Sequence, residues 1–148
     1  MTGTQKHVVK VAESGNGPYS QIVTAGGHIL SADEPRDVGG NDVGPSPYEY
    51  IMAGLGACTA MMLRSYVTRH NWGVDRITIE LQHEKIVTAG STSKVDQFRR
   101  VIHLEGDVSE EQRQKLLEVA ETCAVSQTLR RVSIIESKLA DNFEPTPA

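Results

Sequence analysis

One apolar stretch constrains the fold of this chain more than any other feature. Residues 50–63 contain no charged side chain, inside the longer segment GPSPYEYIMAGLGACTAMML. Ser46 can cap a helix, Pro47 suits its first turn, and Glu49 stands three residues after the cap, as in a capping box. A bilayer span takes about 20 apolar residues, so this shorter run predicts a core helix buried on nearly every side, with Cys58 in its middle.

Charge and length narrow the class of protein. The 148 residues carry a net charge of −4, and basic residues form no run longer than two, so a nucleic-acid partner is not expected. The polar N-terminus lacks the apolar centre of a signal peptide, so we expect a cytoplasmic location and no membrane partner. Neither a repeat nor a linker divides the chain, which predicts one domain over residues 1–148, with 1–5 and 141–148 frayed.

Three short strands are expected before the helix. Residues 7–12, 19–24 and 28–32 are rich in β-branched side chains, and Gly26-Gly27 between the last two suits a tight hairpin. Residues 33–45 are rich in Gly, Asp and Pro and predict a loop that leads into the helix.

Two long strands are expected after the helix, which should end near Gly73 as a left-handed stop. Residues 76–87 and 95–105 alternate in polarity, as half-buried strands do. Their inward faces carry six apolar side chains, one histidine and one arginine: Ile77, Ile79, Leu81, His83, Phe98, Arg100, Ile102 and Leu104. The pattern predicts a long antiparallel hairpin.

A second helix begins at Ser109, where Gln112 completes another capping box. Cys123 continues the apolar stripe of this helix, so we expect it to face inward near the helix C-terminus. A short helix over 126–131 and a final strand over 132–139 follow. The order βββ-α-ββ-α-(α)-β does not alternate strictly, which indicates an α+β fold with largely antiparallel sheets.

The buried helix needs more cover than one sheet and one other helix can give. A second subunit could supply that cover, so we expect a homodimer with twofold symmetry.

The two cysteines can be interpreted in two ways. A lone cysteine on an apolar helix face is usually a small hydrophobic residue, and Cys58 and Cys123 do not have the spacing of a zinc site, so no metal or cofactor is expected. However, both thiols fall on the inward faces of the two main helices, where packing could bring them together. In a reducing compartment such thiols are better read as free, catalytic or redox-active than as a structural disulfide.

A nucleophilic thiolate at Cys58 would need a stabilising partner, because mid-helix it lies far from the helix N-terminus. The cationic candidates, none of them singled out by spacing, are Arg36, His28, His83, Arg99 and Arg100.

Three further residues have ordinary structural interpretations as well. Glu49 falls on the opposite side of the helix from Cys58, which favours a capping role. Tyr48 is more often a helix-end packing residue than a recognition group, and His83 is more often a satisfied core histidine than a ligand.

Several segments of the chain resemble the OsmC/Ohr superfamily, most closely its OsmC-like redox branch: ADEPRDVGGNDVGPSP, PYEYIMAGLGACTAMMLRSY and LEGDVSEEQRQKLLEVAETCAVSQTL. The resemblance covers essentially the whole chain. It implies an intertwined homodimer in which antiparallel sheets from both subunits wrap around the cysteine helices. It also implies a thiol peroxidase for organic hydroperoxides, with Cys58 as the peroxidatic and Cys123 as the resolving cysteine.

The chain departs from the peroxidase pattern in two places. Pro47-Tyr48 stands where peroxidase members have Pro-Glu, so the carboxylate of Glu49 comes one place later. The predicted N-terminal strands contain no arginine to match the family's catalytic one, and the first in the chain is Arg36 in the loop.

Two functional hypotheses follow. The first is a peroxidase that acts through a Cys58 sulfenic acid and a Cys58–Cys123 disulfide, with a dithiol or lipoyl-type reductant. The alternative is a non-enzymatic protein of the same fold that binds a hydrophobic small molecule. A general thiol–disulfide role with a protein partner is less favoured, because the chain has no CxxC motif.

Overall fold

The structure, a computed structural model, describes residues 7–140 and confirms the α+β class with antiparallel sheets. The expected frayed ends at 1–5 and 141–148 lie outside the described residues. The elements are, in chain order, β1 (Val9–Glu13), β2 (Gln21–Ala25), β3 (His28–Ala32), a 3-10 helix η1 (Arg36–Val38), α1 (Pro47–Arg69), β4 (Gly73–Val87), β5 (Lys94–Asp107), α2 (Glu110–Glu121) and α3 (Ala124–Arg130).

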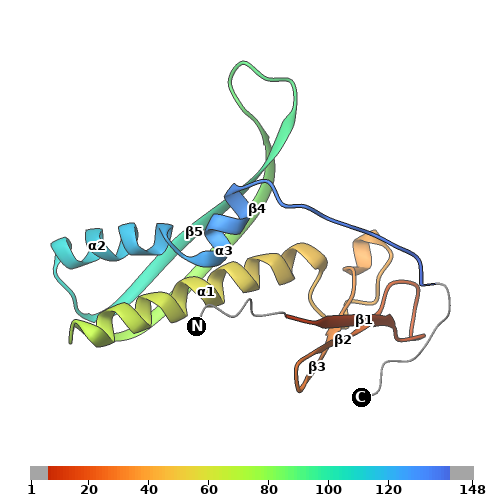
Figure 1. The fold of residues 1–148 in the computed structure, drawn as a ribbon, viewed down its shortest axis with the longest axis horizontal. Coiled ribbons are helices and arrows are strands. Elements are labelled where there is room, and N and C mark those ends of the chain that lie inside the picture. Colours follow the sequence, from red (N-terminus) through yellow and green to blue (C-terminus); the bar gives the residue numbers. More distant parts are fainter. Residues whose placement is uncertain (1–6, 141–148) are drawn as a thin grey trace.

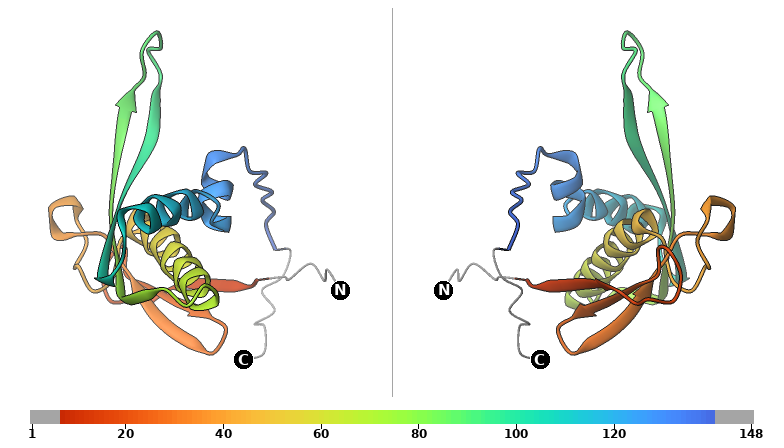
Figure 2. Two further views of the ribbon diagram at one scale, coloured as in Figure 1. Left: turned by 90° about the vertical axis from the view of Figure 1, so that its left-hand side faces the viewer. Right: turned by 90° about the vertical axis from the view of Figure 1, so that its right-hand side faces the viewer.

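The strands form two separate antiparallel sheets. β1, β2 and β3 make a three-stranded sheet in that order, and Gly26 turns the β2–β3 hairpin with a φ of 60°. β4 and β5 form a long two-stranded hairpin whose tip extends well beyond the helices (Figure 2).

Helix α1 begins as the sequence predicts and ends slightly earlier. The backbone N–H of Ser46 donates to Glu49 Oε2 at 2.6 Å, which completes the capping box. The helix stops at Arg69, and the left-handed residue is Asn71, with a φ of 52°, rather than Gly73, which opens β4. Asparagine tolerates this conformation because its short polar side chain can bond locally.

Helix α1 is buried along one face only. Its buried residues share the side that meets the β4–β5 hairpin and α2: Leu55, Gly56, Thr59, Leu63 and Val67. Met61 on another face is 71% exposed. The prediction of a helix buried on nearly every side is therefore wrong for a single chain, because one hairpin and two helices cover only one side of it (Figure 1).

The core forms where α1 and α2 pack against the inner face of the hairpin. Leu63, Val67, Val74, Leu116 and Ala120 are its buried centre. The inward positions predicted for β4 and β5 are all partly buried, whereas their neighbours in the two strands are exposed, with the exception of Gln97. A Cβ at Gly56 would lie 2.7 Å from Leu81 Cδ1, so this glycine allows the close approach of α1 to β4.

Cys123 lies between two helices rather than within one. Helix α2 ends at Glu121, and Cys123 is the N-cap residue of α3, with an extended backbone ψ of 142°. The sequence prediction of an inward-facing cysteine was correct, because Cys123 is fully buried. The prediction that it belongs to the second helix was wrong, because the chain turns there to begin α3.

The final strand expected over 132–139 is not formed. After α3, residues 131–140 run without helix or strand, and Val132, Ile134, Ile135 and Leu139 are 88–99% exposed. Figure 1 shows the segment leaving α3 toward the end of the molecule that holds the N-terminal sheet. A strand forms only beside another strand, and this segment pairs with none in the described part of the chain.

Candidate functional site

Both cysteines lie near the contact between α1 and the α2–α3 junction. Both are free thiols; Cys58 on α1 is half-buried, whereas Cys123 is fully buried. The side chain of Cys58 is among the groups that lower the pKa of Cys123, with a smaller effect than Ser126 or Thr59. Thr59, the next residue on α1, places its Oγ1 3.6 Å from Cys123 Sγ. The fold thus packs the turn of α1 that carries Cys58 against Cys123, which is far from it in the sequence.

Ser126 holds the sulfur of Cys123 through two contacts. Its backbone N–H donates to Cys123 Sγ at 3.3 Å, because Cys123 caps α3 as a serine or threonine would. The Cys123 thiol donates to Ser126 Oγ at 3.1 Å. Both partners are buried, so the contacts are shielded from water.

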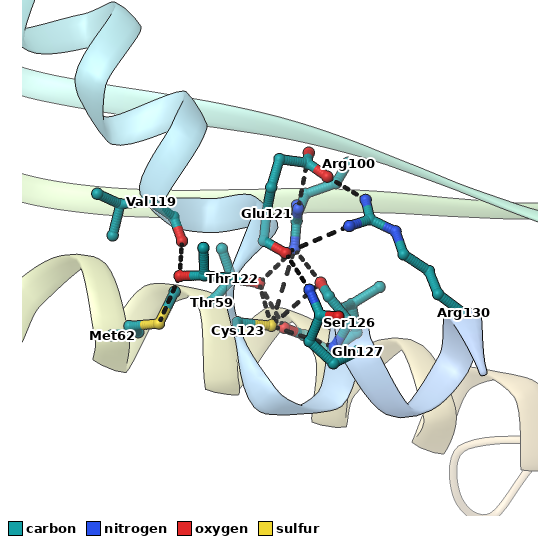
Figure 3. A network of polar contacts seen from close by, with 11 residues as sticks. Thr59, Met62, Arg100, Val119, Glu121, Thr122, Cys123, Ser126, Gln127 and Arg130 are labelled. Atoms are coloured by element: carbon teal, nitrogen blue, oxygen red, sulfur yellow. Dashed lines mark hydrogen bonds and ion pairs between the residues drawn. The ribbon is translucent and has the colours of Figure 1, made fainter. Parts of the chain in front are cut away.

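A single arginine connects the cysteine to three elements of the fold. Arg100 extends from the inner face of β5, and its Nη1 donates to Thr59 Oγ1 at 2.8 Å and to Ser126 Oγ at 2.9 Å (Figure 3). The same nitrogen lies 3.9 Å from Cys123 Sγ. The side chain of Arg100 is only 10% exposed.

Glu121 balances the charge of Arg100. It accepts from Arg100 Nη2 at 3.3 Å and also pairs with Arg130 on α3. The pKa of Glu121 is lowered, chiefly by the hydrogen bond from Arg130, against the opposing effect of burial. The carboxylate therefore stays ionised and bridges the two guanidinium groups, which ties the end of α2 to α3.

The surroundings of Cys123 favour its thiolate. Burial alone would raise the pKa of the thiol, but hydrogen bonding with Ser126, and to a smaller extent interaction with the side chains of Thr59 and Cys58, outweighs it and lowers the pKa from 9.0 to about 7. A substantial fraction of Cys123 is then ionised at neutral pH.

A pocket of about 440 Å³ opens beside this network. Its apolar lining includes Leu55, Phe98, Leu117 and Leu129, while Arg100, Glu121, Ser126 and Arg130 from the polar network line another part. Leu55 precedes Cys58 by three residues on α1, so the pocket lies about one helical turn from the half-buried thiol.

Gln97 also belongs to the lining of this pocket. Its Oε1 is buried and has no hydrogen-bond partner among the described residues. A small, mainly apolar molecule suits a pocket with this lining.

The other residues proposed from the sequence lie away from the thiols. Glu49 acts as the α1 cap, and its pKa is lowered by the hydrogen bond from the Ser46 backbone. Arg36 lies exposed in η1, and no described hydrogen bond or ion pair joins it to either cysteine. His28 is exposed in β3.

Tyr48 and His83 come together in a separate cluster. Their rings stack at 4.2 Å between centroids with an interplanar angle of 7°, and Phe98 packs on the histidine at 4.8 Å. His83 Nε2 lies 2.8 Å from Asp96 Oδ1, and this hydrogen bond is the chief reason that the pKa of Asp96 is lowered. His83 thus has a satisfied structural environment, as expected.

Of the cations considered for Cys58, Arg100 is the one that reaches the cysteine pair, and it contacts Cys123 rather than Cys58. Arg99, its neighbour in β5, points to the other face and pairs with Glu84 at 2.9 Å. Sequence reasoning did not select Thr59, Glu121 or Ser126. The signal for Arg100 was present, because it is the one arginine on the inward face of an otherwise apolar strand.

Neither a metal site nor a membrane span stands out in the part of the chain that the structure describes. Residues 7–140 contain no group of three or more His, Cys, Asp or Glu side chains that could hold a metal ion. None of the helices within this range is long and apolar enough to cross a membrane.

Comparison with solved structures finds the same fold in several proteins. An OsmC-like protein from Mycoplasma pneumoniae superposes with a TM-score of 0.72 at 13% identity, covering 88% of this chain and 91% of that one. OhrB, an organic hydroperoxide resistance protein of Bacillus subtilis, gives 0.61 at 21% identity, with 86% and 93% covered. The organic hydroperoxide resistance protein OsmC from Legionella pneumophila gives 0.61 at 18% identity, with 87% and 92% covered.

Comparison of sequences defines the family. No curated protein matches the chain. The family model described as OsmC-like protein matches residues 39–138, which include α1, the β4–β5 hairpin, the α2–α3 junction and both cysteines. The chain belongs to the OsmC-like protein family.

Proposed function

We propose that this protein is a thiol peroxidase that reduces organic hydroperoxides, with Cys58 as the peroxidatic and Cys123 as the resolving cysteine. The observation that carries the proposal is the placement of a half-buried thiol, Cys58, directly before Thr59, whose Oγ1 lies 3.6 Å from the sulfur of the fully buried, hydrogen-bonded Cys123. The fold shared with organic hydroperoxide resistance proteins supports the same reaction class.

The reaction divides between the two thiols according to their exposure. The Cys58 thiolate attacks the terminal oxygen of ROOH, the O–O bond breaks, and the alkoxide leaves and takes a proton to become ROH. Cys58 is then a sulfenic acid. The Cys123 thiolate attacks its sulfur, which forms the Cys58–Cys123 disulfide and releases hydroxide, protonated to water. The buried Cys123 is protected from peroxide, and Thr59, its neighbour across the contact with α1, directly follows Cys58 in the chain.

A dithiol, such as a lipoyl group, is the proposed reductant. Reduction consumes two thiol groups per disulfide, and a dithiol delivers both from one molecule. The cycle starts from two reduced thiols, which fits the cytoplasmic location expected from the sequence.

A homodimer is part of the proposal. Large apolar side chains are exposed on three separate elements: Val9, Val11, Ile22 and Ile29 of the N-terminal sheet, Met61 of α1, and Ile134, Ile135 and Leu139 after α3. Residues 132–139 have the side-chain pattern of a strand without a partner, and a second copy could provide one. Light scattering after size exclusion is expected to give twice the chain mass of 16.2 kDa; a monomer at micromolar concentration would contradict this part.

The test of the proposed function is peroxide consumption by reduced protein. Cumene hydroperoxide is expected to disappear with dihydrolipoamide as the reductant, and Cys58→Ser is expected to abolish this activity. Cys123→Ser is the matched variant: it should still consume about one equivalent of peroxide, and its Cys58 sulfenic acid should be trapped by dimedone.

Two results would end this assignment. One is a Cys58→Ser protein that consumes peroxide as fast as the parent. The other is a Cys123→Ser protein that becomes labelled by dimedone at no site while the parent remains active.

The pocket also supports the alternative function, the binding of a hydrophobic small molecule. Its five apolar side chains beside two arginines could hold a hydrophobic molecule without any thiol chemistry. A binding protein of this kind would take up a fluorescent fatty acid equally well as parent and as the Cys58→Ser/Cys123→Ser double variant, and the parent would leave cumene hydroperoxide unchanged.

A further inference from the structure

Arg100 occupies a nearly buried position on an apolar strand face, which is unusual for an arginine. It is 10% exposed on a strand face otherwise made of Phe98, Ile102 and Leu104, and burying a guanidinium is costly unless its donors are satisfied. Glu121 pairs with Nη2 of the Arg100 guanidinium, and this ion pair alone would compensate the positive charge. Nη1 is directed instead at two hydroxyl oxygens that both neighbour the sulfur of Cys123 (Figure 3).

The hydrogen atoms at this point can be assigned one by one. Thr59 Oγ1 donates its single hydrogen to the carbonyl oxygen of Leu55 at 2.7 Å and accepts from Arg100 at 2.8 Å. Ser126 Oγ also accepts from Arg100, at 2.9 Å, and no carbonyl takes its hydrogen among the described contacts. A guanidinium has no acceptor, so the hydroxyl hydrogen of Ser126 is left free to turn toward Cys123 Sγ, 3.1 Å away.

When Cys123 loses its proton, the contact with Ser126 reverses. The thiolate then accepts from both the N–H and the O–H of Ser126, with the positive charge of Arg100 at 3.9 Å. Without Arg100, the hydroxyl could rotate and Ser126 could accept from other groups, so this arrangement would no longer be enforced.

We propose that Arg100 is a positioning residue that acts through Ser126, holding its hydroxyl so that Cys123 is the sulfur released as a thiolate when the Cys58–Cys123 disulfide is reduced. This inference rests on the proposed function for the existence of that disulfide. It assigns a direction to the reductive step that neither the sequence nor the proposed peroxide chemistry specifies.

Reduction of the disulfide takes two thiol–disulfide exchange steps. A thiolate of the dithiol reductant attacks Cys58 Sγ, the Cys58–Cys123 bond breaks, and its electron pair leaves on Cys123 Sγ. The new disulfide joins the reductant to Cys58. The second thiolate of the reductant then displaces Cys58 as a thiolate, so the dithiol is oxidised to its cyclic disulfide and the protein gains two electrons. The half-buried position of Cys58 and the full burial of Cys123 favour the same direction of attack.

The experiment compares Arg100→Gln with Arg99→Gln. The two arginines are adjacent in β5, but Arg99 is 61% exposed and pairs with Glu84 on the outer face. The disulfide is formed with diamide rather than peroxide, so the test works even in a protein that lacks peroxidase activity. Its reduction by dithiothreitol is followed by alkylation and mass spectrometry.

Arg100→Gln is expected to slow reduction by about threefold for each unit by which the pKa of the leaving Cys123 thiol rises. The disulfide of Arg99→Gln should be reduced at the same rate as that of the parent, within experimental error. In a Cys58→Ser background, absorbance at about 240 nm follows the Cys123 thiolate directly, and its titration midpoint should rise in Arg100→Gln but not in Arg99→Gln. Arg100→Lys keeps the positive charge but not the planar guanidinium, so its titration midpoint should lie between those of Arg100→Gln and Arg99→Gln.

The site of the mixed disulfide tests the direction of attack. A monothiol, 2-mercaptoethanol, added briefly to the disulfide form should be found on Cys58 by peptide mapping. Finding it on Cys123, or an unchanged Cys123 midpoint in Arg100→Gln, would overturn the proposal. Should Arg100→Gln fail to fold, Ser126→Ala decides: a raised midpoint supports the proposal and an unchanged one refutes it.

Discussion

The stability of the reduced protein is expected to depend on pH through Cys123. The pKa of this thiol falls from 9.0 to about 7 in the folded state, where Ser126 hydrogen bonds outweigh the effect of burial. For an acid whose pKa is lowered on folding, the stabilisation is fully present above the unfolded pKa and is lost as the pH falls through the folded pKa. The reduced protein should therefore gain stability between about pH 7 and pH 9.

The size of the effect follows from the two values of the pKa. Two units correspond to about 3 kcal/mol at about 1.4 kcal/mol per unit. The sulfur is fully buried, so bulk solvent does little to screen this contribution. Against a typical stability of roughly 5–15 kcal/mol, a change of about 2–3 kcal/mol is large enough to measure.

Urea unfolding at pH 6.0 and pH 9.5 measures the change, with parent and Cys123→Ala proteins compared under reducing conditions at one protein concentration. The cavity left by the alanine costs the same at both pH values, and other titrating groups cancel in the difference. The free-energy gap between the parent and Cys123→Ala should widen by about 2–3 kcal/mol at pH 9.5. A gap that stays constant, or narrows, would refute the interpretation of the Cys123 environment.

Three further predictions concern stability: two test the packing of the core and one tests the cap of α1. Gly54→Ala, where a Cβ meets nothing within 4 Å, should be more stable than Gly56→Ala, whose Cβ would lie 2.7 Å from Leu81, by about 1–3 kcal/mol in thermal melts; equal stabilities would contradict the close packing of α1 on β4. Leu63→Ala at the fully buried centre should cost about 2–5 kcal/mol in urea unfolding, and Val101→Ala, at a site 54% exposed, less than about 1 kcal/mol. Ser46→Ala should cost about 0.5–2 kcal/mol through loss of the α1 cap, and no loss would show that the capping box is not needed.

Most of the fold could be predicted from local patterns in the sequence. The capping boxes at Ser46 and Ser109 marked both helix starts, and alternation along 76–87 and 95–105 gave the correct inward face of each strand. These signals depend on neighbours within a few residues, so the sequence contains them completely.

The site was harder to predict, because its contacts join residues far apart in the chain. Arg100 meets Thr59 and Ser126 only when β5, α1 and α3 are packed together. The turn that takes Cys123 out of α2 and makes it the cap of α3 has no Gly or Pro to mark it. The missing strand over 132–139 has a different cause. The segment has the side-chain pattern of a strand, but a strand needs a neighbouring strand, and the described part of the chain offers none to it.

The most direct measurement of the proposed cycle is intact-mass analysis of the reduced protein after one equivalent of cumene hydroperoxide. We expect a loss of about 2 Da and a single cross-linked peptide pair that joins Cys58 to Cys123. An unchanged mass, or a gain of oxygen on Cys58 with Cys123 still free, would contradict it.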